Sequence, residues 1–491
     1  MGGGVELVFI PGPGVGHLIA TIEMAKLLLH KCPRHDLSIS VLIMKVPFDS
    51  KLSLYIDTLV AEHEESSTRL KPVILSASTT ADHTKTVTFF RSFVESHKQS
   101  AREVIKEIHT KASSGSDRLA GIVLDMFCVD FMDLANEFGI PAYVFFTSGA
   151  GTLGMLLYLQ SLRDEDGKDV TEFKGSDPDL EIPVYSKPYP AKLIPAVVLD
   201  KTGGGADMFL DFGRKIREAK GIMVNTFSEL ERHAMESLSK YKGIKIPPVY
   251  PVGPILNLQS DKIAESGKEI LEWLNRQPDS SVVFLCFGSG GSFPEPQVKE
   301  IASALERSGH RFMWALRKPP AKGAVYPTDF NSPGEALPEG FLERTKDIGK
   351  VIGWAPQAAV LAHPAVGGFV SHCGWNSTLE SVWFGVPMAT WPIYAEQQAN
   401  AFQLVTDIGI GVDLKMDYIK DFDSEEFPEA VKAEVIEAGI RKLMDNPSAS
   451  PARMKARELK QKSREAMEEG GSSFNFLMSF LDQIFKSSSS S

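Results

Sequence analysis

Residues 354–397 read WAPQAAVLAHPAVGGFVSHCGWNSTLESVWFGVPMATWPIYAEQ and contain the most informative pattern in the chain. Gly367 to Val370 is a short apolar run bounded by turn-forming residues, which is typical of a buried parallel strand. The small polar residues after it predict the start of a helix, with Asn376 or Ser377 as the N-cap. A helix start behind a strand end offers unpaired backbone N–H groups and a positive dipole end. The pattern therefore predicts an anion-binding turn.

The side chains around this turn suit a diphosphate followed by a ribose. His372, Asn376 and Ser377 would add hydrogen-bond donors for the diphosphate. Glu380 lies one turn into the expected helix, where its carboxylate can accept hydrogen bonds from both ribose hydroxyls. An ordinary helix-surface acid is the alternative for Glu380, and its spacing from His372 and Asn376 favours the ribose contact. Together these residues indicate a nucleotide site.

The two ends of the same stretch suit a base and a hexose. Trp354 begins a loop, and a flat indole there can stack on a uracil ring, as aromatic side chains do on bases. Glu396 and Gln397 form a carboxylate–amide pair, which suits the vicinal hydroxyls of a hexose. Trp391 is expected to be core, whereas Trp375, beside the phosphate turn, is expected to contact the donor.

The stretch resembles the signature of the plant secondary-product glycosyltransferases, the family-1 UDP-sugar transferases with the GT-B fold. That signature opens with Trp and closes with Gln after 44 residues, as residues 354–397 do. Gln357, the HCGWNS run at 372–377, Glu380 and Pro392 also fall at the positions of the family pattern. The one departure is Glu396, where many members carry Asp, and the carboxylate is kept.

The resemblance implies a hexosyltransferase that uses a UDP-sugar as donor co-substrate, with no tightly bound cofactor. In this family a closing Gln, here Gln397, goes with UDP-glucose, and a closing His more often with UDP-galactose. Ser289 lies in a Gly-rich turn and is expected to touch the diphosphate, although a simple turn serine is the alternative. The residues expected to contact the donor are Thr147, Ser289, Trp354, Ala355, Gln357, His372, Trp375, Asn376, Ser377, Glu380, Tyr394, Glu396 and Gln397.

The candidate catalytic pair is His17 and Asp125. His17 lies at the tip of a Gly-rich turn between a strand and a helix, and Asp125 ends another apolar strand. An imidazole with a pKa near ~6.5 can take a proton from a hydroxyl at neutral pH, and a carboxylate behind it assists. The alternative is that His17 caps a helix and Asp125 caps a turn. The resemblance favours the pair, because the family uses a His–Asp pair at these positions.

The order of strand-like and helix-like segments predicts an α/β protein with two Rossmann-like, doubly wound parallel-sheet domains that face each other across a cleft. The resemblance implies that this is the GT-B arrangement. Each half opens with a strand, a Gly-rich turn and a helix. The expected domains are 1–252, which binds the acceptor, and 253–465, which binds the UDP-sugar. Residues 466–491 are expected to form an amphipathic helix and a disordered tail of serines, and the resemblance implies that this helix returns to the first domain.

The expected reaction is inverting transfer of glucose to a hydroxyl of a small lipophilic acceptor, which gives a β-glucoside. A flavonoid, a chalcone or another phenolic is the preferred acceptor, with a triterpenoid or a hormone as alternatives. An apolar slot suits a flat phenolic, and its candidate residues are Phe89, Phe90, Phe127, Phe146 and the loop 189–193. The residues expected to contact the acceptor are Gly16, His17, Phe127 and Ala395.

Charge, apolar runs and cysteine content argue against nucleic-acid binding, a membrane span and a metal site. The net charge of −11 argues against a nucleic-acid partner, and no apolar run is long enough to span a membrane. The four scattered cysteines predict reduced core thiols and a cytoplasmic location, with a monomer as the default. Three DxD-like pairs, at 164–166, 177–179 and 421–423, lie in polar, loop-like stretches, so no metal is expected.

Two competing functions are weaker. An NAD(P)-dependent oxidoreductase would explain the first Gly-rich turn, but the glycines are out of register with a dinucleotide fingerprint, and the second strand ends in Lys45 rather than an acid. A non-catalytic UDP-sugar-binding protein would explain residues 354–397, but it gives no role to His17 and Asp125.

Overall fold

The computed structural model describes residues 4–32, 36–46, 50–66, 69–79, 86–114, 118–241, 243–258, 265–321, 326–421, 424 and 426–486. The predicted serine tail, 487–491, lies outside them. The chain divides into two compact units. Unit 1 comprises Met1–Thr171, Val198–Asn257 and Glu465–Ser491, and unit 2 comprises Glu172–Val197 and Leu258–Arg464. The sequence ranges put residues 172–197 in the first domain, whereas their contacts group them with unit 2.

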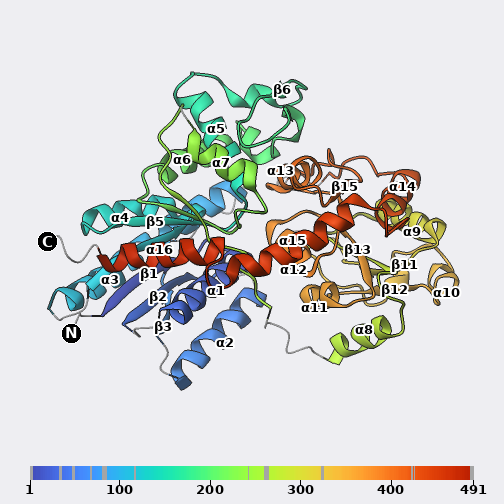
Figure 1. Ribbon diagram of the computed structural model, residues 1–491, viewed down its shortest axis with the longest axis horizontal. Helices are drawn as coiled ribbons and strands as arrows, with labels where there is room; N and C mark the ends of the chain where they lie inside the picture. Colours follow the sequence, from blue (N-terminus) through green and yellow to red (C-terminus); the bar gives the residue numbers. More distant parts are fainter. Residues whose placement is uncertain are drawn as a thin grey trace. The chain divides into compact units, whose positions relative to one another are not determined.

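Unit 1 is built on a seven-stranded, wholly parallel sheet (Figure 1) in the order β3-β2-β1-β4-β5-β8-β9. The strands are near-continuous apolar runs, as expected for a sheet covered on both faces. They are β1 (Val5–Ile10), β2 (Leu37–Met44), β3 (Leu70–Leu75), β4 (Arg118–Asp125), β5 (Ala142–Phe146), β8 (Ile222–Val224) and β9 (Val249–Pro251). The helices are α1 (Val15–Lys31), α2 (Ser50–Ser66), α3 (Thr86–Ser114), α4 (Met132–Glu137), α5 (Ala150–Asp164), α6 (Gly205–Ile216), α7 (Arg232–Lys240) and α16 (Ser472–Lys486).

Unit 2 is built on a six-stranded parallel sheet in the order β12-β11-β10-β13-β14-β15. Its strands are β10 (Val282–Cys286), β11 (Arg311–Ala315), β12 (Gly349–Ile352), β13 (Val366–Ser371), β14 (Met388–Thr390) and β15 (Gly411–Asp413). Its helices are α8 (Glu265–Asn275), α9 (Glu295–Ser308), α10 (Phe341–Arg344), α11 (Gln357–Ala362), α12 (Trp375–Phe384), α13 (Gln397–Gln403) and α14 (Ala433–Met444), and α15 (Pro451–Met467) begins in this unit. The core around this sheet includes Trp314 and Trp391, so the prediction that Trp391 is core is confirmed.

The segment Glu172–Val197 of unit 2 carries a small antiparallel hairpin, β6 (Asp179–Leu180) and β7 (Tyr189–Pro190). Tyr189 stacks on Tyr185 at 4.9 Å and packs edge-on against Phe402 of α13, also at 4.9 Å. Ser186 donates a hydrogen bond to Asp407. These contacts group loop 189–193 with unit 2, whereas the sequence ranges place it in the first domain.

The C-terminal helix α16 groups with unit 1, where it contacts α1, β4 and β9. Its buried face comprises Leu477, Phe480, Leu481 and Ile484. Phe480 meets Tyr143 of β5 edge-on at 5.0 Å.

Among the described residues, no helix has both the length and the apolar character that a membrane span requires.

Truncating this anchor tests the docking of α16. Phe480 has no exposed surface, so Phe480→Ala should leave a cavity and cost about 3–5 kcal/mol of stability. The measurement is urea unfolding followed by circular dichroism. The exposed neighbour gives the control, Ser479→Ala, which should leave the curve unchanged. An unfolding midpoint for Phe480→Ala equal to that of the parent would contradict this packing.

Candidate active site

The first cluster of predicted site residues forms in unit 1, where three neighbouring strands end. β1, β4 and β5 lie side by side and run in the same direction, so their carboxyl ends meet at one edge. His17 lies in the first turns of α1, behind β1, Asp125 ends β4, and Thr147 follows β5. The topology therefore brings together three side chains that are far apart in the sequence.

His17 and Asp125 form a short hydrogen bond. His17 Nδ1 lies 2.7 Å from Asp125 Oδ2, and the Asp125 side chain is fully buried while 29% of the His17 side chain is exposed. A carboxylate only accepts hydrogen bonds, so Nδ1 carries the hydrogen and Nε2 is left with a lone pair. The Thr147 hydroxyl lies 3.0 Å from the same Nδ1. The contact expected between His17 and Asp125 is observed, and the orientation suits a base that acts through Nε2.

The Asp125 carboxylate is held from two other directions. Its Oδ1 accepts a hydrogen bond from the Phe127 backbone N–H at 3.0 Å, which caps the short 3-10 helix Met126–Phe131. A β-carbon at Gly12 would lie 2.5 Å from this Oδ1. Glycine is needed at position 12 because the loop after β1 passes directly against the carboxylate.

Aromatic rings gather beside His17. Phe127 meets the imidazole at 5.1 Å, stacks on Phe90 at 5.7 Å, and contacts Phe209 and Phe212 of α6 at 6.1 and 6.0 Å. We call Phe90, Phe127, Phe209 and Phe212 the aromatic wall. The other two predicted phenylalanines, Phe89 and Phe146, are buried in the core with 9% and 0% exposure, and Phe212 of the wall is also buried, at 5%. Nothing in the sequence marks the α6 pair, because the pattern FLDF reads as an ordinary amphipathic helix face.

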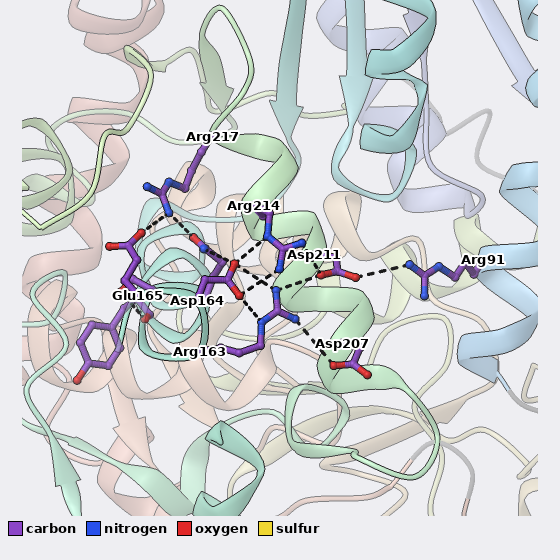
Figure 2. A network of polar contacts seen from close by, with 11 residues as sticks. Arg91, Arg163, Asp164, Glu165, Asp207, Asp211, Arg214 and Arg217 are labelled. Carbon is purple, nitrogen blue, oxygen red and sulfur yellow. Dashed lines mark hydrogen bonds and ion pairs between the residues drawn. The ribbon is translucent and has the colours of Figure 1, made fainter. Parts of the chain in front are cut away.

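An ion-pair network ties together the helices that carry the wall (Figure 2). Asp211 of α6 pairs with Arg91 of α3 at 3.6 Å and with Arg163 of α5 at 3.0 Å. Asp164 accepts from Arg163 at 2.6 Å and from Arg214 at 2.8 Å. Burial raises the pKa of Asp164, but hydrogen bonds from Arg214, Arg163 and Gln160 outweigh it and hold that pKa below its usual range. Asp164 is therefore a paired helix-end residue rather than the solvated loop charge that the sequence suggests.

The second cluster lies in unit 2 and again follows strand ends. Ser289 comes after β10, the HCGWNS turn after β13, Trp354 after β12, and the YAEQ run at 394–397 after β14. All the predicted donor residues except Thr147 belong to this unit, whereas Gly16, His17 and Phe127 belong to unit 1 and Ala395 to unit 2.

The phosphate turn differs from the prediction at the helix start. α12 begins at Trp375 with Gly374 as its N-cap and no side-chain cap, so the prediction of Asn376 or Ser377 as N-cap is wrong. Cys373 adopts φ +63 and is fully buried, and its carbonyl accepts a hydrogen bond from Asn400 of α13 at 3.0 Å. The turn is folded so sharply that the helix can begin one residue before the polar cluster. Asn400 was missed because nothing in the local sequence marks it.

His372 is enclosed by backbone from both turns. A β-carbon at Gly288 or at Gly374 would lie 2.5 or 2.6 Å from its Nε2, which explains the glycines. Its Nδ1 has no hydrogen-bond partner. Burial lowers the pKa of His372 to about 4, and the polar backbone of Cys286 opposes this shift only in part. The imidazole is therefore neutral at physiological pH and can donate a single N–H. The neighbouring Ser289 and Asn376 are exposed, and Trp375 is buried.

The other residues predicted to contact the UDP-sugar include two smaller groups. Gln357 Nε2 donates to Ser377 Oγ at 2.9 Å and to Glu380 Oε2 at 2.8 Å, which fixes the Glu380 carboxylate. Trp354 is 52% exposed, a high value for a tryptophan, and the next residue, Ala355, is buried. An exposed indole can stack on a base, and a fixed carboxylate can accept hydrogen bonds from ribose hydroxyls.

The YAEQ run leads into α13, which begins at Gln397 with Glu396 as its N-cap. Gln397 is 4% exposed, and its Oε1 accepts the backbone N–H groups of Ile393 at 2.9 Å and Tyr394 at 3.1 Å. Because Oε1 accepts these two bonds, the NH₂ end of the same amide is the part that can donate hydrogen bonds to a ligand. Ala395 adopts φ +55, a left-handed conformation that a residue with a β-carbon rarely takes outside functional sites. Tyr394, Ala395 and Glu396 are half-buried.

Comparison with known proteins identifies the family. The model for "UDP-glucoronosyl and UDP-glucosyl transferase" matches residues 218–443. UDP-glycosyltransferase 71E1 of Stevia rebaudiana is 52% identical over 98% of both chains, and UDP-glucose flavonoid 3-O-glucosyltransferase 6 of Fragaria ananassa is 51% identical over 98% of both. The chain belongs to the plant UDP-glycosyltransferases. It is therefore a glycosyltransferase enzyme, as the resemblance implies.

A solved structure of this UDP-glycosyltransferase family gives the same fold. Medicago truncatula UGT71G1, in complex with UDP-glucose, superposes with a TM-score of 0.84 at 40% identity and covers 98% of each chain. The predicted GT-B class is thus confirmed. Among the described residues, no group of three or more His, Cys, Asp or Glu side chains is arranged to hold a metal ion. Asp423 of the third DxD-like pair lies outside the described residues.

The buried His372 predicts a pH-dependent loss of stability. The unfolded chain takes up a proton near the ordinary pKa of 6.5, whereas the folded chain resists it down to about pH 4. The contribution of His372 to the free energy of unfolding is therefore fully present above pH 6.5. It falls by about 3 kcal/mol as the pH decreases from 6.5 towards 4. His372→Gln should show a shallower decline over this window in urea unfolding at successive pH values. A decline as steep as that of the parent would contradict the burial.

Proposed function

We propose that the chain is an inverting, UDP-glucose-dependent O-glucosyltransferase that acts on a small phenolic acceptor. The observation that carries the proposal is the 2.7 Å contact between His17 Nδ1 and a fully buried Asp125, beside the aromatic wall. UDP-glucosyl transfer to a small acceptor is supported by the relatives, several of which are named as flavonoid or anthocyanidin 3-O-glucosyltransferases. The inverting course and the phenolic acceptor are our inference.

The proposed reaction begins at the acceptor hydroxyl. His17 Nε2 takes the hydroxyl proton, and Asp125 stabilises the imidazolium that forms. The acceptor oxygen forms a bond to the anomeric carbon of glucose from the face opposite UDP, while the bond from that carbon to the diphosphate oxygen breaks. An α-linked donor thereby gives a β-glucoside and UDP, and the proton on His17 is released to solvent.

Hydrogen-bond donors of unit 2 would stabilise the leaving diphosphate. The start of α12 has no side-chain cap, so its backbone N–H groups can bind the phosphate oxygens, together with His372, Asn376, Ser377 and the hydroxyl of Ser289. We propose that these groups do the work that a divalent cation does in other transferases. Thr147, at 3.0 Å from His17 Nδ1, would contact the sugar next to the base.

The proposed acceptor contacts are Gly16, His17, Phe127 and Ala395. A phenolic ring suits the wall because Phe90 and Phe127 are only half-buried and present stacked faces. A triterpenoid or hormone acceptor is the alternative. A panel of flavonoids, chalcones, simple phenols, triterpenes and hormones with UDP-glucose separates these acceptor classes, with product mass and the anomeric proton coupling as readouts. Formation of a glucoside from none of the phenolic members would contradict the proposed acceptor class.

The proposed compartment is the cytoplasm, with a monomer as the working state. All four cysteines are free and buried, which is the state that a reducing compartment maintains.

Removing the base is the direct test of the mechanism. His17→Ala should lower kcat by at least about 10²-fold, because a positioned general base contributes 10²–10⁴-fold. UDP binding, measured by calorimetry, should persist. His30, an exposed histidine at the other end of α1, supplies a matched control: His30→Ala should retain full activity. Near-normal turnover by His17→Ala would exclude His17 as the base.

Gln397 tests the choice of sugar. Gln397→His removes both the amide donor and the Oε1 that caps the Ile393–Tyr394 turn. The ratio of kcat/KM for UDP-glucose to that for UDP-galactose should fall by about tenfold, the effect of one or two lost hydrogen bonds. UDP affinity is the internal control and should change little. An unchanged donor ratio would remove the proposed contact between Gln397 and the hexose.

A further inference from the structure

The indole of Trp354 is covered on one side by a buried cation. The guanidinium carbon of Arg317 lies 5.5 Å from the centre of the Trp354 rings, within the range of a cation–π interaction. Arg317 is only 7% exposed, whereas Trp354 is 52% exposed. The indole thus has a fixed charged support and a large accessible surface.

Arg317 is held in place by its own contacts. Its Nε lies 2.8 Å from Asp329 Oδ1, and its Nη2 donates to the Pro327 carbonyl at 2.7 Å. A backbone bridge between Lys318 and Thr328, at 2.8 and 3.1 Å, fastens the same loop to the residue after Arg317. The planar guanidinium therefore has several fixed partners and little freedom to leave the indole.

The same loop also reaches the residue before Trp354. A β-carbon at Gly353 would lie 2.6 Å from the carboxyl carbon of Asp329, so the carboxylate rests against this stretch of backbone. The strands explain the meeting: β11 and β12 pair with Ala315 opposite Ile352, and Arg317 and Trp354 each lie two residues beyond that pair. Arg317 and Asp329 thus support both the side chain and the backbone at Trp354.

We propose that Arg317, held by Asp329, is a positioning residue for recognition of the nucleotide base. It fixes the indole of Trp354 in advance, so that the uracil ring stacks without the cost of ordering a mobile exposed side chain. This inference rests on the proposed function, which assigns the uracil contact to Trp354. Arg317 itself touches neither the sugar nor the phosphates in this proposal.

The expected effect is confined to binding of the base. Arg317→Leu should raise the Kd for UDP and the KM for UDP-glucose by about tenfold, from the lost support and the added ordering cost. The value of kcat should stay within about twofold, because the base is bound equally in the ground and transition states. Affinity for inorganic pyrophosphate, measured by competition, should not change. Equal losses for UDP and pyrophosphate would indicate a general structural effect and overturn the proposal.

Further variants keep the test interpretable if Arg317→Leu does not fold. Arg317→Lys retains a cation but loses the fork of donors, and Asp329→Asn removes the ion pair while the guanidinium remains. Both should weaken UDP binding less than Arg317→Leu and leave pyrophosphate affinity intact; parental UDP affinity in both would overturn the proposal. The exposed neighbouring cation gives the matched control, Lys318→Leu, which should bind UDP like the parent.

Trp354→Ala separates this inference from the proposed function. If Trp354→Ala binds UDP normally, the uracil contact itself is wrong. If Trp354→Ala weakens UDP binding but Arg317→Leu does not, only the role of Arg317 is wrong. When Arg317→Leu and Trp354→Ala are combined, the loss of UDP affinity should equal that of Trp354→Ala alone, since Arg317 acts through the indole. Additive losses would overturn the proposal.

Discussion

Parallel pairing between neighbouring strands is the constraint on which both clusters depend. Parallel strands send their carboxyl ends to the same edge, so residues that follow them meet whatever their distance in sequence. In unit 1 the pairing of β4 with β1 and β5 brings Asp125 to His17 and Thr147. In unit 2 the pairing of Cys286 with Ser371 brings the Ser289 turn beside the phosphate turn. The chemistry of each cluster follows from this register.

Close packing of backbone then fixes the individual groups. Gly12 admits the Asp125 carboxylate, and Gly288 and Gly374 admit the imidazole of His372. The left-handed Cys373 is held by a tertiary contact, because its carbonyl accepts a hydrogen bond from the side-chain amide of Asn400. These groups are positioned before any ligand arrives, which lowers the cost of reorganisation during the reaction. The same principle explains why Arg317 supports an exposed tryptophan.

The sequence predicts whatever depends on local pattern. The apolar run at 367–370 predicts β13 to within one residue at each end, and the small polar residues after it predict the helix α12. Gln357, Glu380 and Gln397 remain predicted contacts of the UDP-sugar. Contacts between parts of the chain that are distant in sequence cannot be predicted from local pattern. The fastening of 172–197 to unit 2 depends on Tyr189 meeting Phe402, and the aromatic wall depends on α6 packing beside Phe127. The N-cap at Gly374 follows from the left-handed Cys373, which no local preference indicates.

We propose that unit 2 binds a UDP-sugar at its strand ends for attack by a hydroxyl that His17 activates. The binding half of this proposal is tested by a crystal structure of the protein with UDP. We expect the diphosphate at the start of α12, between Ser289 and the 372–377 turn, with uracil on the exposed face of Trp354. Density for UDP elsewhere, with this turn empty, would contradict it.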